Sequence, residues 1–230
     1  MLFDTHTHLF LPEFDLDRDG MIQRAIDTGV KKMILPNIDS SSIDSMLKLA
    51  EQFPENCFPT MGLHPCSVKE NFESELKIVE ENLFDKKQKK FFAIGEMGLD
   101  FYWDKTFVEQ QKKCFRIQCK WASELKLPII IHSREATQDC IDLVSEMKNE
   151  NLTGVFHCFG GTVEEANQII ALGFYLGIGG VLTFKKSGLD ETLKQIDLNH
   201  LVLETDSPYL APVPYRGKRN ESSYLKIVAE

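Results

Sequence analysis

The chain has 230 residues, 43% of them hydrophobic, and a formal net charge of -9. Length and composition favour one domain, residues 1–230, with a substantial buried core. The acidic balance argues against a protein that coats nucleic acid or anionic membranes by bulk attraction. It does not exclude an enzyme that acts on phosphates, because bound divalent cations can reverse the local field.

Short apolar runs alternate with longer amphipathic stretches along the whole chain, which predicts alternating strands and helices. The first strand lies in the stretch Phe3–Leu9, and Gly29 is placed to end the helix that follows. Further strands are expected at 32–37, 58–64, 91–96, 128–132, 154–157, 174–178 and 200–206. Helices are expected at 15–28, 41–52, 73–84, 106–125, 136–148, 163–172, 189–195 and from about 221. Lysines at 86, 87, 89 and 90 predict a solvated loop.

Eight such units in one chain of this length predict an α/β fold, a closed parallel barrel of the TIM type, (β/α)8, rather than an open doubly wound sheet. The run Pro128–His132 is continuously apolar apart from its last residue, which is typical of a strand covered on both faces. The eighth helix has little room before Glu230. Either the chain is truncated there or the barrel closes with a short last helix.

Residues that can bind metal occur at the carboxyl ends of the predicted strands. His6 and His8 end the first strand, and because alternate strand residues share a face, both imidazoles project together. The others are His64, Glu96, His132, His157 and Asp206. In a (β/α)8 barrel the carboxyl ends carry the active site, so we expect these residues to surround one cavity and bind metal. Only His200 is expected at the opposite end.

The same residues lie in six motifs: Thr5-His6-Thr7-His8, Gly62-Leu63-His64-Pro65, Gly95-Glu96-Met97-Gly98-Leu99-Asp100, His132-Ser133-Arg134, His157-Cys158-Phe159-Gly160 and Glu204-Thr205-Asp206-Ser207-Pro208-Tyr209-Leu210. In this order, the motifs resemble the TatD family of metal-dependent deoxyribonucleases, which belongs to the wider group of amidohydrolase-like barrels. The resemblance runs from residue 1 to about 220.

The resemblance implies two divalent metal ions, with Mg, Mn or Zn as candidates. The implied ligands are His6, His8 and Asp206 for one ion, His132 and His157 for the second, and Glu96 for both. A bridging role suits a carboxylate, because it has two oxygens whereas an imidazole offers one nitrogen to one metal.

Phosphodiester hydrolysis is the chemistry that such a metal pair suits, because two ions about 3.5 to 4 Å apart stabilise the attacking and the leaving oxygen at phosphorus. Asp206 is expected to accept the proton of the attacking water beside its ligand role, and Glu96 to hold the ions. His64 has no place in either ligand set. It contacts the substrate phosphate or shuttles protons, or else makes a purely structural hydrogen bond.

Aromatic and basic residues near the ligands are candidates for binding nucleic acid, because aromatic faces stack on bases and guanidinium groups bind phosphates. The substrate-binding candidates are Arg134, Tyr102, Phe159 and Tyr209, and the same ring includes Phe101, Trp103, Tyr215, Arg216, Lys218 and Arg219. The alternative for residues 101–103 is that they pack the loop after the fourth strand and do not bind substrate. Glu204 shares the inward face of Asp206, where it either bonds to a ligand histidine or forms a salt bridge.

The expected function is metal-dependent hydrolysis of DNA as a 3′-5′ exonuclease on single-stranded ends, a direction that rests on the resemblance alone. Fold and metals do not choose the substrate, so ester or amide hydrolysis, as in deacylases that remove D-amino acids from tRNA, stays open. A non-catalytic metal-binding protein is the third alternative. It would lack a ligand or have a plugged cavity, and no ligand expected from the family is missing.

We expect a cytoplasmic protein that is a monomer by default. Its expected partner is nucleic acid, and no membrane association is expected. No apolar run approaches the roughly 20 residues of a membrane span, and the N-terminus lacks the layout of a secretory signal. The six cysteines form no CxxC pair, so reduced thiols are expected.

Overall fold

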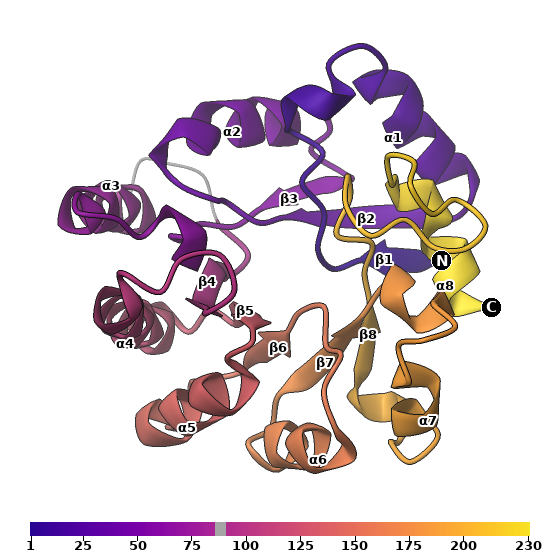
Figure 1. Ribbon diagram of the computed structural model, residues 1–230. Helices are drawn as coiled ribbons and strands as arrows, with labels where there is room; N and C mark the ends of the chain where they lie inside the picture. The colour runs from indigo at the N-terminus through magenta and orange to yellow at the C-terminus, as the bar shows by residue number, and fades with distance from the viewer. Residues whose placement is uncertain (86–90) are drawn as a thin grey trace.

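Parallel strands form the centre of the fold, and helices surround them (Figure 1). The computed structural model describes residues 1–85 and 91–230, so the lysine-rich segment expected as a loop lies outside the described residues. The described strands are β1 (Leu2–Asp4), β2 (Val30–Leu35), β3 (Cys57–Pro59), β4 (Ile94–Asp100), β5 (Ile129–Arg134), β6 (Gly154–Phe156), β7 (Tyr175–Ile178) and β8 (Leu201–Leu203).

The strands close into a barrel. Regular pairing gives two parallel sheets, β1-β2-β3 and β4-β5-β6-β7-β8. A bridge between Met61 and Ile94 joins β3 to β4, and a bridge between Thr7 and Ser207 joins the segments that follow β1 and β8. The amide of Thr5 also donates to the carbonyl of Leu203 across this second junction, at 3.0 Å. The expected (β/α)8 barrel is confirmed.

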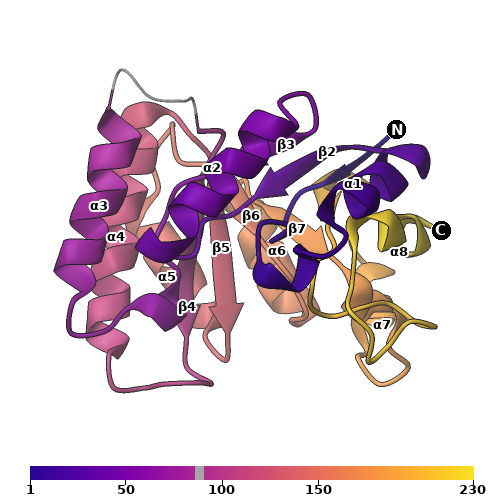
Figure 2. The same ribbon diagram turned by 90° about the horizontal axis from the view of Figure 1, so that it is seen from above.

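The helices lie outside the barrel in both views (Figures 1 and 2). Their bounds are α1 (Arg18–Asp27), α2 (Ile43–Gln52), α3 (Phe72–Phe84), α4 (Val108–Leu125), α5 (Thr137–Met147), α6 (Val163–Ala171), α7 (Leu189–Leu193) and α8 (Leu225–Ala229). Thr162 and Glu165 form a reciprocal capping box at the start of α6. Gly29 follows α1 with a φ of 99°, as expected of a helix-ending glycine. The last helix, α8, is short and packs against β1 and β8.

Large apolar side chains fill the space between barrel and helices, including the fully buried Phe14, Phe115, Phe156 and Phe174. Burial of each such side chain stabilises the fold by roughly 1.5 to 3 kcal/mol. Within the described part of the chain, no helix has both the length and the apolar character of a membrane span.

Strand β4 differs from its expected position at 91–96, because it runs on to Asp100. All seven of its residues are buried, and Gly98 and Asp100 pair with His132 and Arg134 of β5. Glu96 is therefore in the middle of the strand, and Asp100 is the residue that ends it. The expectation of one strand over 58–64 was also too long. Beyond β3 the chain keeps only the single bridge at Met61.

Candidate metal centre

The expected ligands gather at the carboxyl end of the barrel. They come from five strands, β1, β4, β5, β6 and β8, or from the few residues that follow them. Their side chains border a cavity of about 960 Å³, whose lining includes His8, His64, Glu96, His132, His157 and Asp206. His6 lies just beneath this lining and is fully buried, and its ring stacks on the ring of His157 with 3.8 Å between centroids.

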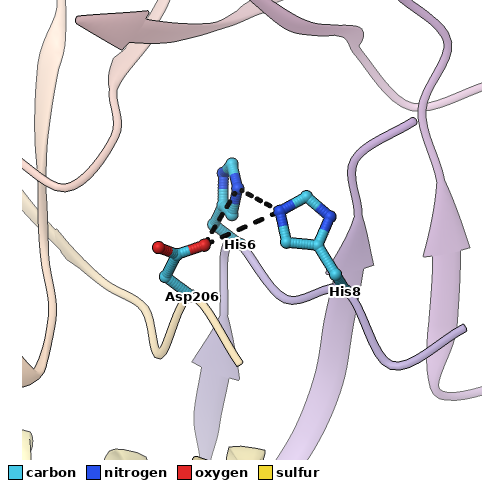
Figure 3. Close-up of side chains that lie close together, drawn as sticks. All are labelled: His6, His8 and Asp206. Atoms are coloured by element: carbon cyan, nitrogen blue, oxygen red, sulfur yellow. Dashed lines mark hydrogen bonds and ion pairs between the residues drawn. The ribbon is translucent and has the colours of Figure 1, made fainter. Parts of the chain in front are cut away.

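One group of ligand atoms comes from the two ends of the chain. Figure 3 shows His6, His8 and Asp206 pointing toward one another. The Nε2 atoms of His6 and His8 are 3.2 Å apart. Oδ1 of Asp206 is 3.7 Å from Nε2 of His6 and 3.6 Å from Nε2 of His8.

Glu96 lies between this group and a second one. Its Oε2 atom is 3.1 Å from Nε2 of His6 and 3.4 Å from Nε2 of His8. Its Oε1 atom is 3.0 Å from both Nδ1 of His132 and Nε2 of His157. These two nitrogens are 3.3 Å from each other. Each oxygen of Glu96 therefore faces a different pair of histidines.

These distances fit metal binding. Ligand atoms bound to one ion at about 2.0 to 2.2 Å stand roughly 3.0 to 3.6 Å apart. Within both groups the ligand atoms lie 3.0 to 3.7 Å apart. The donors are nitrogen and oxygen only, a set that suits Zn, Mn or Mg rather than soft ions. The structure thus brings together all six residues that the sequence singled out as ligands.

The ionisable groups of the cluster shift one another's pKa in opposite directions. Although burial opposes the charged form, Glu96 and Glu204 raise the pKa of His157 well above its usual value. Burial alone would raise the pKa of Glu96, but His64, His6 and His157 around it hold that pKa well below its usual value. Burial likewise lowers the pKa of His6. Asp206 behaves differently, because burial raises its pKa to about 6. A carboxylate and neutral imidazoles are the forms that bind divalent ions.

The bonds of His64 fix its tautomer. Its Nδ1 accepts a hydrogen bond from the amide of Cys66 at 3.0 Å, so the ring proton resides on Nε2. Nε2 lies 3.2 Å from Oε1 of Glu96 and donates toward it. Between the open alternatives, this geometry favours a hydrogen bond that orients Glu96, although His64 also borders the cavity.

Asp100 is a site residue to which the sequence reasoning assigned no role. It is 1% exposed, and its Oδ2 lies 2.9 Å from Nε2 of His132. Its Oδ1 accepts from the amides of Tyr102 and Trp103, at 3.0 Å each. Burial opposes ionisation, yet the bonds from His132 and these amides lower the pKa of Asp100 below its usual value. A signal was present, because Asp100 follows Glu96 by four residues and shares its strand face.

Glu204 faces inward as expected. It is fully buried, its Oε1 accepts from the amide of Cys158 at 2.6 Å, and the same oxygen lies 3.4 Å from Nδ1 of His157. Gly177 makes room for it, since a Cβ there would lie 2.3 Å from Oε2 of Glu204. Glu204 therefore orients His157 from the side of the ring that faces away from Glu96. His200 lies before β8, at the opposite end of the barrel, also as expected.

The substrate-binding candidates differ in their position relative to the cavity. Arg134 and Tyr209 border the cavity. Tyr102 is exposed beside it, and the guanidinium of Arg134 stacks over its ring at 4.0 Å. Trp103 borders the cavity and is 67% exposed, so it does not simply pack the loop. Phe159 is 4% exposed and belongs to the apolar core, which corrects the expectation that it stacks on a base.

The basic residues after β8 fall into two groups, those that border the cavity and one that does not. Arg216 and Lys218 border the cavity. Arg219 does not, because it pairs with Asp17 at 2.7 and 2.8 Å and donates to the carbonyl of Glu13. Its expected place in the ring around the ligands was wrong. Its role is to tie the segment after β8 to the start of α1.

Comparison with known proteins shows which family the chain matches. The family model described as "TatD related DNase" matches residues 3–230. The chain is 40% identical over 231 residues to an uncharacterized metal-dependent hydrolase, YabD, of Bacillus subtilis, covering all of this chain and 89% of that protein. It is 34% identical over 235 residues to the 3′-5′ ssDNA/RNA exonuclease TatD of Erwinia tasmaniensis, covering all of this chain and 90% of that protein.

Solved structures give the same result. The TatD homologue YJJV of Escherichia coli matches with a TM-score of 0.92 and 29% identity, covering 99% of this chain and 87% of that one. A TatD family hydrolase of Entamoeba histolytica matches with a TM-score of 0.80 and 25% identity, covering 99% and 89%. The resemblance read from the motifs and the class of enzyme expected from it are confirmed. The chain belongs to the TatD-related DNase family of metal-dependent hydrolases.

Proposed function

We propose that the protein hydrolyses phosphodiester bonds of single-stranded DNA, removing nucleotides from a 3′ end. The observation that carries this proposal is the position of Glu96, whose two oxygens face two separate pairs of histidines. Two divalent ions, Mg, Mn or Zn, held by these groups would activate water and stabilise the attacking and leaving oxygens of a displacement at phosphorus.

The protein's own residues have distinct roles in this proposal. Asp206 accepts the proton of the attacking water, a role that suits a carboxylate whose Oδ1 lies at the first group of ligand atoms. His64 holds Glu96 by donating from Nε2 at 3.2 Å. Asp100 and Glu204 orient His132 and His157 from behind.

The wall of the cavity supports a nucleic acid substrate. Arg134 stacks over Tyr102 and lies 5.3 Å from the centre of the Trp103 ring, so its position is fixed while its N–H groups remain available for a phosphate. The exposed Trp103 offers a face for a base. The name of the Erwinia tasmaniensis relative, a 3′-5′ ssDNA/RNA exonuclease, supports both the substrate and the direction.

The active unit in this proposal is one domain, residues 1–230, acting as a monomer in the cytoplasm. The six cysteines are free thiols, which fits a reducing compartment.

The direct test uses a single-stranded oligonucleotide labelled at its 5′ end, incubated with the purified protein and Mg²⁺ or Mn²⁺. We expect a ladder of products that shortens from the 3′ end, complete inhibition by EDTA, and recovery when metal is restored. A D-aminoacyl-tRNA is the comparison substrate. Turnover of that ester without cleavage of DNA would replace the proposal with the deacylase alternative.

A further inference from the structure

Two of the three cations that follow Tyr215 are not used by the proposed mechanism. Arg219 is bound to Asp17, but Arg216 and Lys218 are exposed and border the cavity. We call Arg216 and Lys218 the basic edge. In a protein with a net charge of -9, cations at the mouth of a catalytic cavity stand out from the acidic average and create a local site for anions.

Aromatic rings hold the basic edge in place. The guanidinium of Arg216 stacks 3.8 Å over the ring of Phe184, which also borders the cavity. The ammonium of Lys218 lies 6.0 Å over the ring of Tyr215. Tyr215 in turn stacks on Tyr224 with 4.2 Å between centroids. Stacking fixes the flat face of a guanidinium and leaves its N–H edge free, so Arg216 is ready to receive an anion.

The basic edge and the first cationic contact, Arg134, lie on different walls of the same cavity. Trp103 follows β4, and Arg134 ends β5. Arg216 lies in the segment after β8 and stacks on Phe184, which follows β7. Both walls present an arginine stacked on an aromatic ring, Arg134 on Tyr102 and Arg216 on Phe184. Glu96, His132 and Asp206 border the same cavity.

We propose that the basic edge is a second phosphate subsite, which binds a phosphate of single-stranded nucleic acid next to the phosphate that lies at the metal ligands. This inference rests on the proposed function and adds a requirement to it. A substrate that reaches both walls needs at least two phosphates, so the subsite selects polynucleotide chains over small esters that carry one phosphate.

Binding measured without turnover tests the subsite. The probe is a fluorescently labelled oligothymidylate, titrated in EDTA so that no hydrolysis occurs, and followed by anisotropy at several salt concentrations. For the double variant Arg216→Ala, Lys218→Ala we expect a Kd about tenfold higher. We also expect the slope of log affinity against log salt to fall by about 0.7, the value of one phosphate contact on a single strand.

A matched control removes the same charge elsewhere. Lys48 and Lys120 are exposed on α2 and α4, outside the cavity lining, so Lys48→Ala, Lys120→Ala should bind nearly as the wild type does. Thermal unfolding shows whether both variants are folded. Equal Kd values for the two double variants would overturn the subsite, and so would a wild-type protein that fails to bind the probe. Wild-type binding without cleavage on adding metal would contradict only the proposed function.

Discussion

The Nε2 atom of His132 lies 2.9 Å from Oδ2 of the buried Asp100. Asp100 is ionised and accepts, so Nε2 carries the ring proton and Nδ1 keeps its lone pair. That lone pair is directed toward Glu96 and His157, where the second group of ligand atoms meets. A carboxylate behind a metal-binding histidine fixes its tautomer and its orientation and increases its basicity.

Replacing Asp100 by Asn should therefore lower metal affinity and DNA cleavage by about 10- to 100-fold. Asn presents an amide N–H₂ as well as an oxygen, so the preferred tautomer of His132 is no longer enforced. Metal titration by calorimetry and the pH profile of cleavage measure the effect. Asp104→Asn is the matched control, because Asp104 lies in the same loop but pairs with Lys69 at 2.7 Å. Equal losses in the two variants would show that Asp100 has no special role.

The two groups of ligands should lose metal separately. In the double variant His6→Ala, His8→Ala, the group built around Asp206 keeps no imidazole, whereas His132, His157 and Oε1 of Glu96 remain in place. We expect the metal content, measured by elemental analysis, to fall from two ions per chain to one. Loss of both ions would mean that the two sites are not separable.

The alternation of side chains along a strand made part of this metal centre predictable from the sequence. Strand alternation predicted that His6 and His8 point the same way; β1 ends earlier than expected, at Asp4, yet their Nε2 atoms do meet, 3.2 Å apart. The rule that barrel active sites lie at strand carboxyl ends brought Glu96, His132 and Asp206 together with them. The end of β4 was missed because Gly98 interrupts the apolar run and suggests a turn. In the folded protein Gly98 lies inside a buried strand, so the strand reaches Asp100.

The close approach of β4 and β5 at Gly98 predicts that a side chain there lowers the stability of the fold. A Cβ at this position would lie 1.9 Å from the carbonyl oxygen of His132, and the φ of Gly98 is 152°. Gly98→Ala must push β4 and β5 apart, at a cost of about 3 kcal/mol, which lowers Tm by about 6 to 12 °C. Gly160→Ala is the control, since nothing lies within 4 Å of its Cβ position. Calorimetric Tm values that fall equally for both variants would contradict this account.

Arg134 should act on substrate affinity more than on turnover. Its guanidinium is stacked on Tyr102 and faces the cavity, so removal of one phosphate contact should raise KM for single-stranded DNA about tenfold. Arg116→Ala removes a cation that instead pairs with Glu146 on the helical exterior, at 2.8 Å. Steady-state kinetics compares the two variants. A change in kcat alone for Arg134→Ala would speak against a phosphate contact.

Long-range packing explains what the sequence could not show. Phe159 and Arg219 both follow strands that carry ligands, and chain position alone gave no reason to separate them from Tyr209 or Arg216. Phe159 turns into the core, and Arg219 reaches back to Asp17 near the start of the chain. The contact of Arg219 depends on where α1 and the segment after β8 meet, and the burial of Phe159 depends on the packing around β6; local sequence pattern encodes neither.

The central claim is that the Glu96 carboxylate serves both metal sites, and the Glu96→Ala protein tests it most directly. With neither oxygen present, we expect fewer than two ions per chain, and cleavage of single-stranded DNA reduced at least about a thousandfold, equal to several kcal/mol of transition-state stabilisation. Circular dichroism would establish that the variant is folded. A folded Glu96→Ala protein that binds two ions and cleaves DNA at the wild-type rate would contradict the claim.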